Sequence, residues 1–377
     1  MRITIVQGPF LPVPALLGGA VEKVWFNLGK AFAKRGHQVT HISRAYPTLP
    51  ASEEIEGVRH LRVSGFASPP TFARRMALDL WFALRARSRL PDADILVTNT
   101  FWLPVLVGRG GRRGLPYVHV ARYPKGQMKL YRRAILQTVS EPIRQAIVAD
   151  DPQAAERTRV IPYPLANAYL QPRVAEGSRT LLFTGRVHPE KGVHLLIEAF
   201  ARLAPARREG WDLKIVGPWE VAFGGGGDTY LGQLRALAAP VAGQVEFVGR
   251  VFDEARLIGL YTGARIFVYP SLAEKGETFG LAALEAMAAG CAPVVSGLAC
   301  FGDFITHGNN GVVFDHRAAD PAGALATALG DLMADPARTE QLREAAWHQA
   351  RGYTMDRVTG LFLDDFASLR PDAARLP

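Results

Sequence analysis

The chain has 377 residues, of which 48% are apolar and 21% charged, and it contains two cysteines. This length exceeds what one hydrophobic core usually serves, so we expect two domains. Cys291 and Cys300 form neither a metal-type pair nor a disulfide framework, which excludes a disulfide-stapled secreted fold. The apolar stretch over 286–301 is interrupted by glycine and proline and is too short to cross a bilayer.

The charge is divided unevenly along the chain. Residues 1–170 contain 24 Lys and Arg against 11 Asp and Glu, a net charge of +13, whereas the remainder contains 20 against 24, a net of −4. A basic first half predicts an anionic partner. Because the sequence has no zinc-ligand spacing, helix-turn-helix or RNP-type motif, we do not expect nucleic acid. An anionic membrane surface or a phosphorylated acceptor fits this charge better.

Strands and helices alternate in the first half, which predicts a parallel sheet covered by helices. The chain opens on a strand at 3–6 and not on a signal peptide, so we expect a cytoplasmic protein, with attachment to the inner face of the cell membrane as an option. A helix is expected over 21–34, where apolar residues recur at helical spacing and Gly36 ends it. Further strands of this half are expected at 39–43, 95–98, 117–120 and 136–139.

The same alternation restarts after an irregular, proline-containing segment at 163–179, which we interpret as a linker. We therefore expect an N-terminal domain over 1–170 and a C-terminal domain over 171–354. Both are expected to be Rossmann-like, doubly wound parallel-sheet domains facing each other across a cleft where ligands bind. The glycine run 224–227 is interpreted as a surface loop with no helix directly after it. Strands of the second half are expected at 180–184, 213–216, 245–248, 266–269, 293–296 and 312–314.

Two cations follow the strand at 180–184, in the segment GRVHPEKG over 185–192. A helix is expected from 193, so Arg186 and Lys191 lie in a strand-to-helix loop at the ligand-binding edge of the sheet. Arginine supplies a planar fork and lysine a point charge, and together they suit a diphosphate group. From this loop alone, solvated surface cations explain the pattern equally well.

Two carboxylates, Glu277 and Glu285, flank the turn and helix start in the segment ETFGLAALE. The helix expected over 281–289 begins at Gly280, where free backbone N–H groups favour a phosphate. Paired carboxylates are typical of glycoside hydrolysis. Beside a diphosphate, however, their oxygens suit the hydroxyl groups of a sugar and a ribose. The two motifs together predict a site for a nucleotide-diphosphate sugar, with exposed helix-surface glutamates as the structural alternative.

The first half offers two weaker signals. Gly18 and Gly19 precede the helix at 21–34, where glycines let the backbone approach a ligand, although such a pair is as often only a turn. His119 lies at the end of the strand at 117–120, a position that we expect to face the cleft. A single histidine of this kind is also compatible with a structural role.

These segments together resemble family 4 of the retaining glycosyltransferases. The resemblance implies the GT-B fold, a metal-independent reaction without a cofactor, retention of anomeric configuration, and a C-terminal helix over about 355–377 that packs back on the first domain. Two places depart from the family pattern: one extra residue separates Gly19 from Glu22, and Tyr163-Pro164 replaces an Asn-Gly pair. The resemblance rests on GG at 18–19, GRVHPEKG at 185–192, VGP at 216–218, ETFGLAALEAMAAGCAPVVS at 277–296 and HGNNG at 307–311.

The family pattern also implies roles for individual residues. Arg186 and Lys191 would bind the diphosphate, Glu277 the donor sugar and Glu285 the ribose, and His119 would lie near the reacting centre. The catalytic set is thus Arg186, Lys191, Glu277 and His119, with no metal ligand. Contacts to the donor nucleotide are expected from Gly18, Gly19, Gly185, Gly217, Val251, Phe279, Gly280, Leu281 and Glu285.

The function that we predict is transfer of a hexose from a nucleotide-diphosphate sugar, with a UDP-sugar favoured, to a hydroxyl acceptor. The acceptor would be a glycan or a lipid-linked sugar. Two alternatives share the fold: a nucleotide-sugar 2-epimerase, and a non-catalytic subunit that binds sugar nucleotides.

The segment from Thr71 to Leu90 combines arginines with apolar residues. On a helix, Met76, Leu80 and Leu84 share one face, and three arginines (74, 85 and 89) lie opposite, interrupted by apolar positions 78 and 82. This mixture suits an anionic bilayer surface. A helix packed on the sheet, with an ordinary basic edge, is the alternative.

Overall fold

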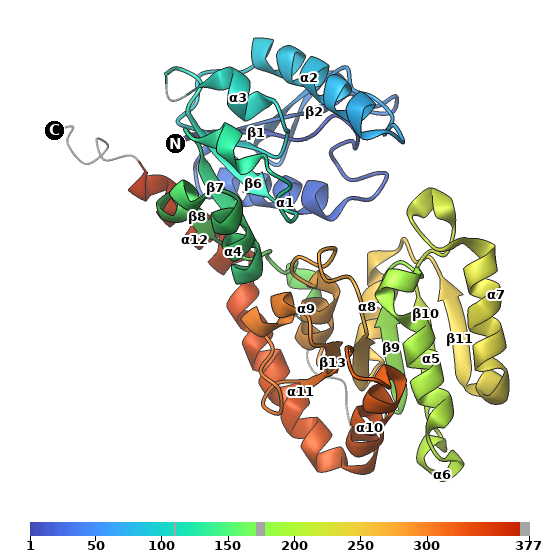
Figure 1. Cartoon of the computed structure of the whole chain (residues 1–377). Coiled ribbons are helices and arrows are strands. Elements are labelled where there is room, and N and C mark those ends of the chain that lie inside the picture. The colour runs from blue at the N-terminus through green and yellow to red at the C-terminus, as the bar shows by residue number, and fades with distance from the viewer. Residues whose placement is uncertain (109–110, 171–177, 370–377) are drawn as a thin grey trace. The chain divides into compact units, whose positions relative to one another are not determined.

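The computed structural model describes residues 1–108, 111–170 and 178–369. The chain divides into two compact units (Figure 1): one is formed by Met1–Pro164 together with the chain from Met355 onward, and the other by Leu165–Thr354. The division after Pro164 falls inside the segment interpreted as a linker. Residues 171–177 of that segment, and residues 370–377 of the expected C-terminal helix, lie outside the described residues.

The first domain contains an eight-stranded sheet in the order β3-β4-β2-β1-β5-β6-β7-β8. All neighbouring strands are parallel except β3, which pairs antiparallel with β4. The sequence patterns did not predict β3, β4 or β8. The strands are β1 (Arg2–Val6), β2 (Gln38–Arg44), β3 (Ser52–Ile55), β4 (Val58–Val63), β5 (Ile95–Thr98), β6 (Leu115–Val120), β7 (Ile135–Thr138) and β8 (Thr158–Val160).

Helices cover both faces of this sheet. On one face α1 (Ala20–Lys34) packs against β2 and β4 and is joined by α12 (Met355–Ser368). The rings of Phe362 and Phe366 pack on Phe32 of α1 and Tyr117 of β6, so the last helix is part of the first domain's core. The other face carries α2 (Phe72–Ser88) and α3 (Leu103–Val107), and α4 (Glu141–Asp150) packs beside β7 and β8.

Helix α2 packs on the sheet through a face other than the one shared by Met76, Leu80 and Leu84. Phe82, Ala83 and Ala86 are fully buried, together with Asp79, whereas Leu84 is exposed. The sheet-facing stripe runs through 79, 82, 83 and 86, so the alternative of a helix packed on the sheet is confirmed. Phe72 and Trp81 are 69% and 58% exposed.

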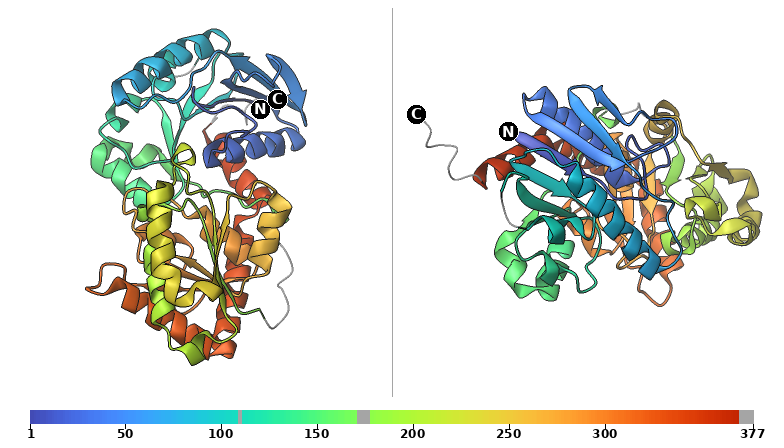
Figure 2. Two further views of the ribbon diagram at one scale, coloured as in Figure 1. Left: turned by 90° about the vertical axis from the view of Figure 1, so that its right-hand side faces the viewer. Right: turned by 90° about the horizontal axis from the view of Figure 1, so that it is seen from above.

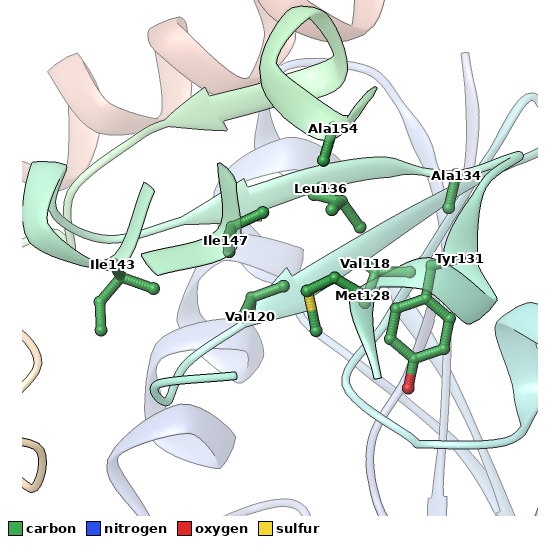
Figure 3. Close-up of a cluster of buried hydrophobic side chains, with 9 residues drawn as sticks. All are labelled: Val118, Val120, Met128, Tyr131, Ala134, Leu136, Ile143, Ile147 and Ala154. Atoms are coloured by element: carbon green, nitrogen blue, oxygen red, sulfur yellow. The ribbon is translucent and has the colours of Figure 1, made fainter. Parts of the chain in front are cut away.

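A compact apolar cluster lies between β6, β7, α4 and the loop that follows β6 (Figure 3). Because successive residues of a strand point to opposite faces, the β6 residues Val118 and Val120 enter this cluster, and His119 points to the other face. The members of the cluster are Val118, Val120, Met128, Tyr131, Ala134, Leu136, Ile143, Ile147 and Ala154.

The second domain contains a six-stranded, wholly parallel sheet in the order β11-β10-β9-β12-β13-β14. On one face α5 packs between α7 and α10, and on the other α9 packs against α8 and α11 (Figures 1 and 2). The strands are β9 (Thr180–Thr184), β10 (Asp212–Val216), β11 (Val245–Gly249), β12 (Ile266–Tyr269), β13 (Ala292–Ser296) and β14 (Val312–Phe314). The helices are α5 (Val193–Arg202), α6 (Pro205–Arg208), α7 (Gly227–Ala238), α8 (Glu254–Thr262), α9 (Leu281–Ala288), α10 (Pro321–Ala334) and α11 (Pro336–Ala350).

The expectation that no helix directly follows the glycine run 224–227 was wrong, because α7 begins at Gly227 itself. Short 3₁₀ helices are Met128–Tyr131, Pro152–Arg157, Asn167–Tyr169, Pro189–Lys191, Val221–Phe223, Ala239–Gln244, Ala299–Asp303 and Arg351–Tyr353. Across the part of the chain that the structure describes, no helix is both long and apolar enough to cross a membrane.

Candidate functional site

Three neighbouring strands of the second sheet end side by side in tight glycine turns. The N–H of Gly185, after β9, donates to Val216 O of β10, and the N–H of Gly217 donates to Gly249 O of β11. A Cβ atom on Gly217 would lie 1.8 Å from the carbonyl oxygen of Gly185, so only glycine fits there. The loops that carry Arg186, Gly217 and Val251 are thereby held next to one another at the carboxyl edge of the sheet.

The loop after β9 holds Lys191 in a fixed place. A short 3₁₀ turn over Pro189–Lys191 is capped by the His188 side chain and ends at Gly192, which has a left-handed φ of 67°. A Cβ atom on Gly192 would lie 2.0 Å from the carbonyl oxygen of Pro270, so this loop packs directly on the end of β12. Lys191 is consequently a buried cation, with a side chain only 9% exposed.

Lys191 and Glu277 form a nearly buried ion pair. The ammonium of Lys191 donates to Glu277 Oε2 at 2.6 Å, and the carboxylate is 12% exposed. The ring of Tyr269 lies 5.5 Å from the ammonium, and Ser271 Oγ lies 3.5 Å from the same carboxylate oxygen. The two motifs that were identified separately in the sequence therefore meet in one cluster of charged groups.

Arg186 is more exposed and is oriented by its own loop. Its guanidinium donates to Gly224 O at 2.7 Å and to the Glu190 carboxylate at 2.5 Å. Its side chain remains 43% accessible. Glu190 also accepts through its backbone carbonyl from Leu272 N, which ties the loop to the segment after β12. This arrangement presents a cation that an anionic ligand can reach.

Glu285 is positioned by a chain of hydroxyl groups. Tyr261 of α8 donates its hydroxyl hydrogen to Glu285 Oε2 at 3.2 Å, so the hydroxyl of Thr184 donates in turn to the Tyr261 oxygen, at 2.5 Å. Burial raises the pKa of Tyr261 well above its usual value, which keeps this hydroxyl a donor. Sequence patterns did not identify Tyr261 or Thr184, since each is distant in the chain from Glu285.

The start of α9 is shaped by Gly280. This residue has a left-handed φ of 86°, and a Cβ atom there would lie 2.4 Å from Cε1 of the buried Phe301 ring. Phe279 is buried against Phe304, so only its backbone is available to a ligand. Leu281 and Val251 are half-buried. The first backbone N–H groups of α9 thus lie at the same edge as Lys191 and Glu277.

The first domain contains a pocket of about 580 Å³ at the carboxyl edge of its own sheet. Gly19 and His119 line this pocket, but Gly18 does not. Gly18 adopts a left-handed φ of 85°. The floor includes Met128 and Tyr131 of the apolar cluster in Figure 3. Its polar lining consists of Glu22, Ser68, Arg75, Asp79, Asn99, Thr100, His119, Arg122, Gln127 and Tyr131.

His119 is fixed as a neutral side chain. Gln137 donates its amide hydrogens to Thr138 O and Ile161 O, so its Oε1 faces His119 and accepts from Nδ1–H at 2.6 Å. Nε2 is then an acceptor, 3.2 Å from the Tyr163 hydroxyl. Burial lowers the pKa of His119 to about 4, opposed by the Gln137 bond. At neutral pH both ring nitrogens are thus bonded within the domain, Nδ1 to Gln137 and Nε2 to Tyr163.

Two carboxyl groups in this pocket were not predicted to function there. Asp79 accepts from the backbone N–H groups of Phe101 and Trp102, and burial raises its pKa to about 6 against these hydrogen bonds. Burial also raises the pKa of Glu22, opposed by a backbone hydrogen bond and by the charge of Arg122.

Two family models match the chain. "Glycosyltransferase Family 4" matches residues 18–165, and "Glycosyl transferases group 1" matches residues 170–349. The chain is similar to the D-inositol 3-phosphate glycosyltransferase of Acidothermus cellulolyticus, with 29% identity over 337 residues that cover 78% of this chain and 72% of that protein.

Two solved structures share the fold. Sucrose-phosphate synthase from Thermosynechococcus elongatus aligns with a TM-score of 0.80 and 19% identity, over 98% of this chain and 99% of that one. The Anabaena protein HepE, solved in complex with UDP-glucose, aligns with a TM-score of 0.71 and 18% identity, over 98% and 100%.

Proposed function

The chain is a glycosyltransferase of family 4 with the GT-B fold, and we propose that it moves a hexose from a nucleotide-diphosphate sugar to a hydroxyl acceptor with retention of anomeric configuration. The observation that carries this proposal is the group formed by Arg186, Lys191, Glu277 and Glu285 at one edge of the second sheet. It supplies two cations for a diphosphate and two carboxylates for sugar hydroxyl groups.

The two cations are proposed to stabilise the transition state of the transfer. As the bond between the anomeric carbon and the β-phosphate oxygen breaks, negative charge develops on that oxygen, and Lys191 and Arg186 stabilise it. The acceptor hydroxyl attacks from the same face, and its proton passes to the departing phosphate oxygen. This route needs no carboxylate base, and it leaves Glu277 to orient the donor sugar. The fixed cations take the part that a divalent metal would otherwise play.

The donor that we propose is a UDP-sugar. Support comes from HepE, which was solved with UDP-glucose, and from Glu285, whose carboxylate can accept from ribose hydroxyl groups. The Tyr261 hydroxyl holds that carboxylate in place at 3.2 Å. No cofactor is part of the proposal, because the nucleotide sugar itself provides the activated group.

The acceptor is proposed to bind in the pocket of the first domain. Its lining combines Asp79, Asn99 and Thr100 with two arginines, 75 and 122. Carboxylate and amide oxygens accept from hydroxyl groups, and arginine donors suit a phosphate, so this pocket fits a phosphorylated polyol or sugar. His119 would form part of the wall, with its two ring nitrogens already bonded to Gln137 and Tyr163.

The first domain is also proposed to contact an anionic membrane through α2, which would give access to a lipid-linked acceptor. Phe72, Trp81 and Leu84 project from this helix, and Arg74, Arg87 and Arg89 are exposed beside them. Exposed apolar side chains among cations suit the interface of anionic lipids.

Co-sedimentation with vesicles containing anionic lipid should be strong at low salt for the natural protein. It should be weak for Arg87→Glu/Arg89→Glu and unchanged for the control Arg207→Glu; binding unaffected by the double change would reject this surface.

The test of the proposed function is release of nucleoside diphosphate from a panel of nucleotide hexoses, followed with and without extracts that supply acceptors. Acceptor-dependent release, with an α-linked donor giving an α-linked product by NMR, is the expected result. Conversion of the free nucleotide sugar to an epimer would instead identify a 2-epimerase. Binding of nucleotide sugars without any turnover across the acceptor panel would identify a binding subunit.

A further inference from the structure

Arg250 lies between two phenylalanine rings at the end of β11. Its guanidinium carbon is 3.7 Å from the centre of the Phe223 ring and 3.8 Å from the centre of the Phe252 ring. Phe252 is 77% exposed, and Phe223 is also exposed. Exposing two adjacent aromatic rings to water is unfavourable, and exposed apolar groups that occur together often mark a binding site. The arrangement of both rings around one arginine therefore indicates a function.

The geometry fixes the plane of the guanidinium and leaves its edge open. Both rings lie close to the same carbon atom without contacting each other, which places them on opposite faces of the guanidinium. Within the described residues, Arg250 donates no hydrogen bond and takes part in no ion pair. The two rings therefore cover both faces of the guanidinium and hold its plane in place, while its N–H groups at the edge remain available to a ligand.

This fork belongs to the same edge of the sheet as the proposed diphosphate site. Arg250 follows Gly249, whose carbonyl accepts from Gly217 N in the row of glycine turns described above. Phe223 directly precedes Gly224, whose carbonyl holds the guanidinium of Arg186. Two strand spacings, about 10 Å, separate the end of β9 from the end of β11. Arg250 also leads into α8, which carries Tyr261 beside the ribose-binding candidate Glu285.

We propose that Arg250, held by Phe223 and Phe252, is a specificity-determining residue that recognises the nucleobase of the donor. Resting on the proposed function, this places the base at the end of β11, with the ribose near Glu285 and the diphosphate near Arg186. Arginine has donors and no acceptor, so it can pair with the carbonyl O4 of uracil or with O6 of guanine. It cannot pair with the amino group that cytosine and adenine carry at the equivalent position. The site therefore selects keto bases over amino bases.

The experiment is isothermal titration of four nucleoside diphosphates, UDP, CDP, GDP and ADP, into the full-length protein. UDP and CDP form the matched pair, because their rings differ only in the group at position 4 and in the hydrogen that uracil carries on N3. The proteins are the natural chain, Arg250→Ala, and Arg256→Ala, which removes an exposed arginine from α8 six positions away. Thermal melting of each variant verifies the fold.

The natural protein should bind a keto nucleotide roughly tenfold or more tightly than its amino counterpart. In Arg250→Ala the affinities for the two members of the pair should lie within about twofold of each other, because the affinity for the keto member falls. Arg256→Ala should show the same affinities as the natural protein. Equal binding of keto and amino nucleotides by the natural protein, or an unchanged preference in Arg250→Ala, would overturn the inference and leave the proposed function standing. If none of the four binds at all, the proposed function fails as well.

Discussion

Lys191 and Glu277, which are 86 positions apart in the chain, meet in an ion pair of 2.6 Å. Each comes from a separate strand-to-helix loop, and each side chain is about one-tenth exposed. When two opposite charges are removed from water in this way, each one is stable in the folded protein only while the other is present. In the proposed reaction the diphosphate and the sugar hydroxyl groups become additional partners of the same two charges, so the pair is assembled before the donor arrives.

This dependence should be measurable as a coupling in stability. Lys191→Met leaves the Glu277 carboxylate buried without its partner, and we expect a loss of about 3–5 kcal/mol in the free energy of unfolding. Lys191→Met/Glu277→Leu removes both charges and should lose less than the sum of the two single changes. Urea unfolding of the natural protein, both single variants and the double variant measures this cycle. Additivity within about 0.5 kcal/mol would show that the two charges do not depend on each other.

Gly280→Ala should destabilise the second domain. The change places a Cβ atom 2.4 Å from the buried Phe301 ring at a residue with a φ of 86°, so both packing and backbone are strained. We expect a loss of about 1–3 kcal/mol. Gly259→Ala is the matched control, because Gly259 lies within α8 and nothing else is within 4 Å of its Cβ position. That control should be neutral or stabilising by up to about 1 kcal/mol. Equal melting temperatures for the two variants would contradict this account.

Acid should destabilise the first domain through His60. His60 of β4 stacks on His41 of β2, and burial lowers the pKa of His60 to about 4 and that of His41 well below its usual value of 6.5. A histidine with a depressed pKa in the folded state contributes stability above about pH 6.5. That stability is lost progressively as the pH falls toward 4. The loss for His60 is on the order of 3 kcal/mol at 1.36 kcal/mol per pKa unit.

The contribution of His60 is measured as the difference in the free energy of unfolding between two proteins. The free energy of unfolding in urea is compared for the natural chain and His60→Phe between pH 7.5 and 4.5, so that titrating groups away from the His41–His60 pair cancel. Among those groups is Asp79, whose raised pKa of about 6 has the opposite sign and favours folding at low pH. The natural chain should lose stability relative to His60→Phe as the pH falls. A difference that does not vary with pH would remove His60 as the cause.

The parallel sheets could be predicted because most of their strands are short apolar runs bordered by glycine or proline, as at 180–184 and 266–269. The hairpin of β3 and β4 was missed because SEEI and VRHLRV are rich in charge, and no residue of SEEI is buried. Lys191 and Glu277 were found because each occurs in a recognisable motif. Asp79 and Tyr261 were not, because their partners, the N–H groups of Phe101 and Trp102 and the carboxylate of Glu285, come from more than twenty residues away. No local pattern specifies such pairings.

Chelation of divalent metal should leave the transferase activity unchanged. The proposal assigns charge stabilisation to Arg186 and Lys191, so a metal ion has no separate part in the reaction. Initial rates are to be measured after dialysis against EDTA and again after addition of manganese or magnesium. Rates within about twofold of each other are expected. A rate abolished by EDTA and restored by manganese would show that a metal supplies the charge that we assign to the two side chains.

The central claim is that Arg186 and Lys191 stabilise the charge that develops on the departing diphosphate. Its most direct test is turnover at saturating donor for Arg186→Ala and Lys191→Ala, with the exposed Lys275→Ala as the control, each assayed below its melting transition. Loss of one such interaction in the transition state costs about 3 kcal/mol, so both variants should turn over at least about 100-fold more slowly, while Lys275→Ala keeps the natural rate. Turnover within a few-fold of the natural enzyme in Arg186→Ala or Lys191→Ala would contradict the account.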